Sequence, residues 1–166
     1  MPTRHSRPSR PDETQPHTVT IPPDRPATSG IVPFTQIGVN GEPATASALR
    51  EAFAGWVGEH FDLSEEQSTD LALAVNEALA NAVEHAYVDY AEPGPVHLDA
   101  RYDDTTATVV AVVRDEGAWR EPTPDPLHLR GRGIPLMRAL TSRAIISSDG
   151  DGTCVELRWS GLTLRR

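Results

Sequence analysis

The chain has 166 residues, of which 38% are hydrophobic, and it carries a formal net charge of −9. This length suits one domain with a sizeable core, and the acidic balance argues against direct binding to nucleic acids or to anionic membranes. All 15 basic residues are arginines, which excludes phosphate-binding loops and covalent chemistry that require a lysine.

The cysteine count and the hydropathy pattern narrow the cellular compartment. The lone Cys154 can form neither an intrachain disulfide nor a cysteine-cluster metal site, which fits a reducing environment. No apolar run approaches the roughly 20 residues of a membrane span, and the N-terminus has no apolar signal core. We therefore expect a cytoplasmic protein.

The chain divides into a tail, a domain and a short end. Residues 1–30 contain seven prolines, four arginines and almost no large apolar side chains, which predicts a disordered tail. A folded domain is expected over residues 31–160, followed by a C-terminal tail at 161–166. The domain should begin with a strand over Ile31–Val39, and Pro33 favours a place at the edge of a sheet.

Two helices are expected next. Pro43–Phe61 has a proline suited to a first turn, and its face residues recur at three- and four-residue spacing: Leu49, Phe53, Trp56, Val57 and His60. Ser64 is a good N-cap for a second helix that runs to about Tyr87. Its apolar face should comprise Leu71, Val75, Ala78, Leu79, Ala82 and Ala86.

The second half of the chain is predicted to form mainly strands. Val96–Tyr102 alternates apolar and polar residues, and Thr106–Arg114 is more apolar, so these two form a hairpin with the second strand more central. Asp115–Arg130 contains three prolines and is too long for a simple turn, which is typical of a functional loop or lid. A helix opened by Gly131 and Gly133 follows, then strands over Arg143–Ser148 and Thr153–Trp159. The order predicts an α+β two-layer sandwich, with helices on one face of a mostly antiparallel sheet.

Three groups of residues in this layout can carry chemistry. Glu77, Asn81 and His85 form a polar line on the second helix, which is either a solvated helix face or one wall of a pocket. Asp115 and Gly117 follow a buried strand, where a carboxylate can accept a hydrogen bond from an exocyclic amine. Gly131 and Gly133 open a helix whose free backbone N–H groups suit a phosphate. An Asn oxygen suits Mg²⁺, and a Glu one turn earlier can take a proton from a hydroxyl.

The motifs NEALANAVEHAY, DEG, RGRGIPLM and the later GT resemble the ATP-binding superfamily of gyrase, histidine kinases and mismatch-repair ATPases, whose fold is of the Bergerat type. The phrases ANAVEHAY, DEGAW and GRGIPLMRAL are similar to the anti-sigma-factor serine kinases and their actinobacterial relatives. The resemblance covers about residues 31–159.

The resemblance implies roles for single residues. Glu77 would act as or position the general base, and Asn81 would coordinate Mg²⁺. Asp115 would bind the amine of adenine, and Gly117 would lie against the base. The segment Gly131-Arg132-Gly133 would bring backbone amides to the phosphates, and Thr153 would support the adenine through water. His85 matches a residue common in the subgroup and receives no role.

The implied function is an ATP- and Mg²⁺-dependent protein serine/threonine kinase. It would phosphorylate an anti-anti-sigma antagonist and sequester a sigma factor or a similar target. The alternative is a non-catalytic, nucleotide-dependent binding switch. An intact Glu77 argues against the switch, while Trp119, which stands where the family often has glycine, and the short proline-rich lid argue for it.

Two further expectations concern assembly. The catalytic half of a histidine kinase is disfavoured, because no helical hairpin with a phosphoacceptor histidine precedes the domain and the tail is too rich in proline to form one. A homodimer is possible for members of the family, and the first strand and first helix would be its natural interface.

Overall fold

A computed structural model describes residues 29–118 and 132–166. In chain order its elements are β1 (Phe34–Asn40), α1 (Pro43–His60), β2 (Phe61–Asp62), α2 (Glu65–His85), β3 (Pro95–Asp103), β4 (Thr108–Asp115), α3 (Gly133–Ala139), β5 (Arg143–Asp149), β6 (Gly152–Ser160) and β7 (Thr163–Leu164). Of the predicted tail, residues 1–28 lie outside the described ranges, as do residues 119–130 of the predicted lid. None of the helices in the described part combines the length and the apolar character that a membrane crossing needs.

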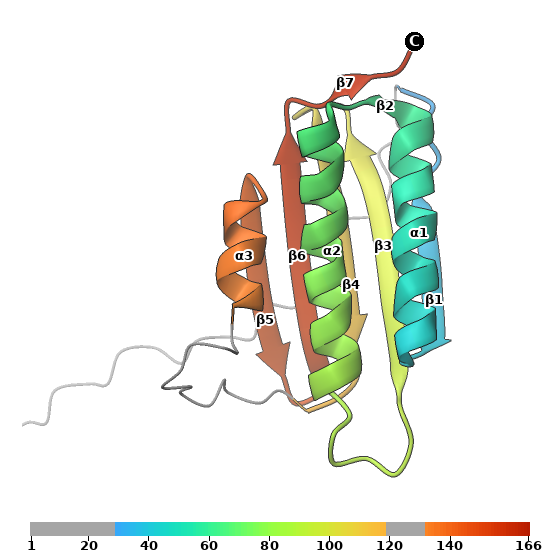
Figure 1. The fold of residues 1–166 in the computed structure, drawn as a ribbon, viewed down its shortest axis with the longest axis vertical. Helices are drawn as coiled ribbons and strands as arrows, with labels where there is room; N and C mark the ends of the chain where they lie inside the picture. Colours follow the sequence, from blue (N-terminus) through green and yellow to red (C-terminus); the bar gives the residue numbers. More distant parts are fainter. Residues whose placement is uncertain (1–28, 119–131) are drawn as a thin grey trace, which may run out of the picture.

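Five of these strands form a sheet that is covered by helices on one side. The strand order is β1-β3-β4-β6-β5, and every pair within it is antiparallel. Figure 1 shows all three helices in front of the sheet, with α2 lying across its middle. The predicted α+β two-layer fold is therefore confirmed, as are the hairpin of β3 and β4 and the central place of β4.

The two long helices form where the apolar spacing predicts them. The helix α1 begins with Pro43 in its first turn. Of the five residues predicted for its face, four are buried, whereas His60, the last residue of the helix, is half-buried. In α2, the Ser64 hydroxyl accepts a hydrogen bond from the Gln67 amide, while the Gln67 side chain accepts one from the Ser64 amide. This capping box fixes the start of α2. All six predicted face residues of α2 are buried, so the helix lies on the sheet with its rotation about its axis fixed.

Aromatic rings hold α1 against the sheet. Phe53 is fully buried, and its ring centroid lies 6.2 Å from that of Trp56 and 6.4 Å from those of Phe34 and Trp159. Such aromatic contacts add to the stabilisation from apolar burial. The cluster joins α1 to the edge strand β1 and to the inner strand β6. It therefore stabilises the helical layer that also contains α2.

Three details differ from the sequence expectation. The first strand begins at Phe34 rather than Ile31, because the Val32 carbonyl accepts a hydrogen bond from the Trp56 indole and so faces α1. The short strands β2 and β7 pair with each other, Phe61 opposite Leu164 and Asp62 opposite Thr163. Neither strand was predicted, and β7 lies within the residues expected to form only a C-terminal tail.

Candidate functional site

The middle of α2 and the first turn of α3 face each other. The two helices pack side by side (Figure 1). A Cβ atom built on Gly133 would lie 3.1 Å from Glu77 Oε2, and 3.4 Å and 3.5 Å from Asn81 Nδ2 and Oδ1. Both side chains are half-buried, whereas His85, one turn further along, is exposed. The structure thus brings together Glu77, Asn81 and Gly133 and leaves out His85.

The first turn of α3 offers backbone amides at this place. The N–H groups of a first helical turn have no acceptor within the helix. Pro135 has no N–H, so the amides available are those of Gly133 and Ile134. Within the described part of the chain no side-chain hydrogen bond caps this helix end, and the N-cap residue Arg132 is exposed. Gly131 lies outside the described residues, so its place in the predicted phosphate-binding segment stays a prediction.

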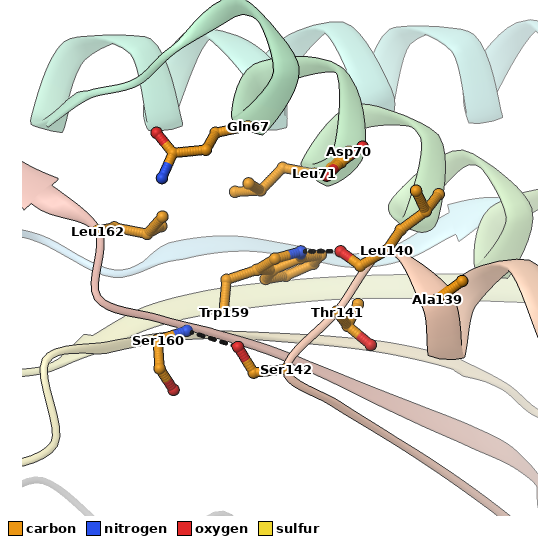
Figure 2. Close-up of a pocket in the computed structure, with 10 residues that line it drawn as sticks. All are labelled: Gln67, Asp70, Leu71, Ala139, Leu140, Thr141, Ser142, Trp159, Ser160 and Leu162. Carbon is orange, nitrogen blue, oxygen red and sulfur yellow. Dashed lines mark hydrogen bonds between the residues drawn. The ribbon is translucent and has the colours of Figure 1, made fainter.

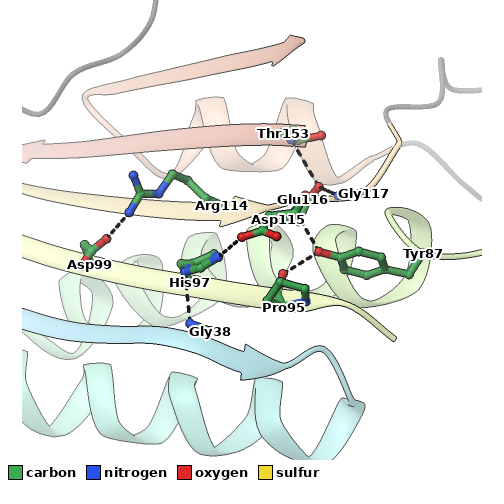
Figure 3. Close-up of polar contacts among 10 residues, drawn as sticks. All are labelled: Gly38, Tyr87, Pro95, His97, Asp99, Arg114, Asp115, Glu116, Gly117 and Thr153. Atoms are coloured by element: carbon green, nitrogen blue, oxygen red, sulfur yellow. Dashed lines mark hydrogen bonds and ion pairs between the residues drawn. The ribbon is translucent and has the colours of Figure 1, made fainter. Parts of the chain in front are cut away.

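Asp115 occupies a second, more deeply buried position at the end of β4. Its Oδ1 accepts hydrogen bonds from the amides of Gly117, at 3.1 Å, and of Thr153, at 3.2 Å, and its residue is 9% exposed (Figure 3). Burial raises the pKa of the Asp115 carboxyl above its usual value, although these two hydrogen bonds act in the opposite direction. The structure therefore brings together Asp115, Gly117 and Thr153, the three residues to which the resemblance assigns contacts with adenine.

Two glycines allow the chain to pack closely around Asp115. A Cβ on Gly117 would lie 2.2 Å from the carbonyl oxygen of Ala86, at the end of α2, and the Ala118 amide donates a hydrogen bond to that same oxygen. Gly152 has a φ of +141°, and a Cβ there would lie 2.0 Å from the Asp115 carbonyl oxygen. The side of Gly117 that would carry a side chain is thus filled by α2. Close contact with this helix is a reason for glycine that the sequence did not indicate.

Two residues that the sequence analysis did not select hold Glu116. The Tyr87 hydroxyl accepts a hydrogen bond from the Glu116 amide at 2.8 Å and donates one to the Pro95 carbonyl at 2.5 Å (Figure 3). His97 Nε2 lies 3.1 Å from Glu116 Oε1, while His97 Nδ1 accepts from the Gly38 amide at 3.1 Å. Because Gly38 supplies the hydrogen to Nδ1, the ring proton lies on Nε2 and faces the carboxylate.

One glycine in the sequence is related to the position of Tyr87, but the relation becomes visible only in the structure. A Cβ on Gly94 would lie 2.2 Å from the Tyr87 ring, so the glycine of the AEPGP turn makes room for that ring. Burial also raises the pKa of Tyr87, which keeps its hydroxyl protonated and able to donate. The partners of the hydroxyl are backbone atoms of distant segments, which no residue pattern identifies.

The metal expected at Asn81 would have few protein ligands. Within residues 29–118 and 132–166, no three His, Cys, Asp or Glu side chains gather as a metal site. A single amide oxygen nevertheless suits Mg²⁺, which keeps several waters and takes phosphate oxygens as ligands. The residues present are therefore compatible with a magnesium ion brought by a nucleotide.

A separate cavity of about 300 Å³ lies away from these residues. It is bounded by the first turns of α2, the segment after α3 and the end of β6 (Figure 2). Its floor includes Leu71 and Trp159, whose indole N–H donates to the Leu140 carbonyl. None of the described residues predicted for the site lines this cavity, which is at the opposite end of α2 from Asp115.

A family model described as a histidine kinase-like ATPase domain matches residues 39–159. The chain belongs to this family. The matched range includes every residue grouped above around Asp115 and Gly133, apart from Gly38, so the candidate site lies within the family's domain.

Two solved structures are similar to this histidine kinase-like ATPase domain. The RsbU and RsbW domains of Rv1364c from Mycobacterium tuberculosis are 25% identical, with a TM-score of 0.61, over 81% of this chain and 33% of that one. The histidine kinase domain of the blue-light activated histidine kinase EL346 from Erythrobacter litoralis is 22% identical, with a TM-score of 0.52, over 70% and 59%. The chain thus spans less than two thirds of each protein, and the second likeness concerns the fold alone.

Proposed function

We propose that this domain binds ATP with Mg²⁺ and transfers the terminal phosphoryl group to a Ser or Thr of an antagonist protein of the anti-anti-sigma type. In the same scheme it sequesters a sigma factor or a similar target. The observation that carries the proposal is the approach of Gly133 to Glu77 and Asn81. The proposal is supported by the short distances between one carboxylate that can act as a base, one amide oxygen that suits Mg²⁺ and the first turn of α3.

The roles follow from the chemistry of each group. Asp115 accepts a hydrogen bond from the adenine amine, and the amides of Gly133 and Ile134 donate to phosphate oxygens. Asn81 Oδ1 would hold Mg²⁺, which would supply positive charge to offset that of the phosphates. The acceptor hydroxyl oxygen attacks the γ-phosphorus, the bond to the β–γ bridging oxygen breaks and ADP leaves. Glu77 takes the hydroxyl proton.

The proposed regulatory role, which is to sequester a sigma factor and phosphorylate its antagonist, rests on sequence motifs. The segments ANAVEHAY, DEGAW and GRGIPLMRAL resemble those of the anti-sigma-factor serine kinases. The pairing of two copies through the first strand and helix stays a prediction. So does the cytoplasmic location.

The test separates binding from transfer. ATP affinity is measured by calorimetry with Mg²⁺ and with EDTA, and transfer is measured with labelled ATP and a cognate antagonist. Glu77→Gln should keep ATP affinity and lose at least about a hundredfold in transfer rate, whereas Asn81→Ala should weaken only the Mg²⁺-dependent part of binding. Glu84→Gln is the matched control, since Glu84 is exposed on the same helix.

Each outcome decides one part of the proposal. A wild-type protein that binds no ATP would overturn it entirely. ATP binding without any transfer to the antagonist would leave the non-catalytic switch. Equal loss of transfer in Glu77→Gln and Glu84→Gln would remove the assigned role of Glu77.

A further inference from the structure

The end of α2 is attached to the segment from Asp115 to Ala118 at three points. Tyr87 holds the Glu116 amide, the Ala86 carbonyl accepts from the Ala118 amide, and the Cα of Gly117 packs on Ala86. Among these three contacts, Tyr87 supplies the only side-chain hydrogen bond within the described residues. The other two contacts are made largely by backbone, so a single atom, the Tyr87 hydroxyl oxygen, can be removed without disturbing them.

The Tyr87 hydroxyl is held in place both by the packing of its ring and by two hydrogen bonds. Tyr87 is 7% exposed, and its ring lies against Gly94 and contacts the Tyr90 ring edge to face. Its oxygen both accepts from the Glu116 amide and donates to the Pro95 carbonyl. A phenylalanine would fill the same apolar space. The hydroxyl therefore serves to fix the peptide next to Asp115, and packing alone does not require it.

We propose that Tyr87 is a positioning residue for base recognition, which holds the Asp115-Glu116-Gly117 segment where the Asp115 carboxylate meets the exocyclic amine of adenine. This inference rests on the proposed ATP binding and assigns a determinant of its base specificity. Asp115 Oδ1 is already oriented by the amides of Gly117 and Thr153. The Tyr87 hydroxyl fixes the peptide group between Asp115 and Glu116, and hence the geometry of the hydrogen bond from the Gly117 amide to Asp115 Oδ1.

The arrangement also links the two ends of the candidate site. Glu77 and Asn81 lie on the same helix that ends beside Tyr87. Along an α-helix the distance from Glu77 to the last helical residue, His85, is about 12 Å, at 1.5 Å per residue. A continuous helix keeps a fixed length. Because Tyr87 attaches the end of this helix to Glu116, it helps to fix the distance between the Asp115 carboxylate and the residues that face Gly133.

The test compares two nucleotides that differ in a single group. ATP and purine riboside triphosphate, which lacks the 6-amino group, are titrated into the wild type, Tyr87→Phe and Tyr90→Phe, and each variant is checked by circular dichroism. Tyr90 is the matched control, because it is 50% exposed and its hydroxyl makes no hydrogen bond within the described ranges. The wild type and Tyr90→Phe should bind ATP at least about tenfold more tightly than the analogue, the scale of one hydrogen bond to a charged group.

In Tyr87→Phe the expected change is selective. ATP affinity should fall by about tenfold while affinity for the analogue stays within about twofold, so the preference for ATP disappears. A variant that keeps the wild-type preference would overturn the inference and leave the proposed function standing. Equal weakening of both nucleotides would also overturn it, because Tyr87 would then support only the fold. A wild type that binds no ATP would instead refute the proposed function.

A second measurement keeps the inference testable if Tyr87→Phe does not fold. The amide resonance of Glu116 is followed by NMR in the wild type during both titrations. It should shift on saturation with ATP and shift much less with purine riboside triphosphate, because only ATP places an amine against Asp115. Equal shifts with both nucleotides would overturn the inference.

Discussion

The two ends of the candidate site are built in different ways. Around Asp115 the contacts are short, buried and made with backbone: two amides on the carboxylate oxygen, the Ala86 carbonyl against Gly117 and the Asp115 carbonyl against Gly152. Around Gly133 the contacts are with the ends of two half-buried side chains, Glu77 and Asn81. The Asp115 end is therefore formed together with the sheet, whereas the Gly133 end can adjust through side-chain rotation. In the proposed function, the base is recognised by the rigid end and the phosphates by the adaptable one.

The largest effect is expected when one methyl group is added at the rigid end, which tests whether the packing around Asp115 is tight. Gly152→Ala should lower the free energy of unfolding by at least about 3 kcal/mol, because the new Cβ meets a backbone oxygen and φ is in the left-handed region. Urea unfolding measures the change. Gly150→Ala, in the same turn and with no heavy atom within 4 Å of its Cβ, should stay within about 0.5 kcal/mol of wild type. Similar values for both variants would show that the packing around Asp115 is not tight.

The same methyl group at the adaptable end should affect activity more than stability. In Gly133→Ala the nearest atom to the new Cβ is Glu77 Oε2 at 3.1 Å, the end of a side chain that can rotate. The free energy of unfolding should change by less than about 1 kcal/mol, because alanine also favours the helix. Phosphoryl transfer should fall by about tenfold, since the Glu77 carboxylate has to shift by a few tenths of an ångström from its position. Urea unfolding and the labelled-ATP assay check the two parts, and unchanged transfer would show that Glu77 keeps its place.

The smallest expected effect concerns the charge of Asp115. Burial raises the pKa of Asp115 in the folded protein, so ionisation of this carboxyl opposes folding. The contribution of Asp115 to stability is therefore largest below its ordinary pKa of 3.8, and it is lost as pH rises through the raised pKa of the folded state. Asp115→Asn keeps an acceptor for Gly117 and Thr153 but cannot ionise. It should raise the free energy of unfolding by about 0.5–1 kcal/mol at neutral pH, a gain that shrinks toward acid pH.

The same substitution should cost function. An Asn oxygen is a weaker acceptor than a carboxylate, so the preference for ATP over purine riboside triphosphate should fall. Unfolding curves at several pH values and the two-nucleotide titration measure both effects on one protein. A variant that is less stable than wild type at neutral pH would show that the buried charge of Asp115 does not oppose folding.

Much of the fold could be predicted because its elements carry their own periodic signals. The 3.6-residue spacing identified α1 and α2, the Ser64 capping box marked the start of α2, and alternation identified β3. The strands β2 and β7 could not be found in this way. Each has two residues, which is too short for any period, and their pairing joins segments about a hundred positions apart.

The candidate site was predictable only in part, for a similar reason. Glu77 and Asn81 lie one turn apart, so the sequence alone places them on one side of a helix. The approach of Gly133 to that side and the grouping of Asp115 with Thr153 depend on helix packing and strand register. Tyr87 was missed because its hydroxyl bonds only to backbone atoms, whose positions are set by the fold and leave no pattern among side chains.

The edge strand β1 contains a β-bulge, which affects how this sheet can pair with a strand of another chain. Gly38, at φ +65°, interrupts the pairing of β1 with β3 between Gln36 and Val39, and its amide donates to His97. An edge strand can extend a sheet only where its N–H and C=O groups point outward in regular alternation. The bulge divides that edge into two short pieces. Strand addition by a second molecule is thus confined to one piece at a time, which protects the exposed Ile37 edge from uncontrolled growth of the sheet.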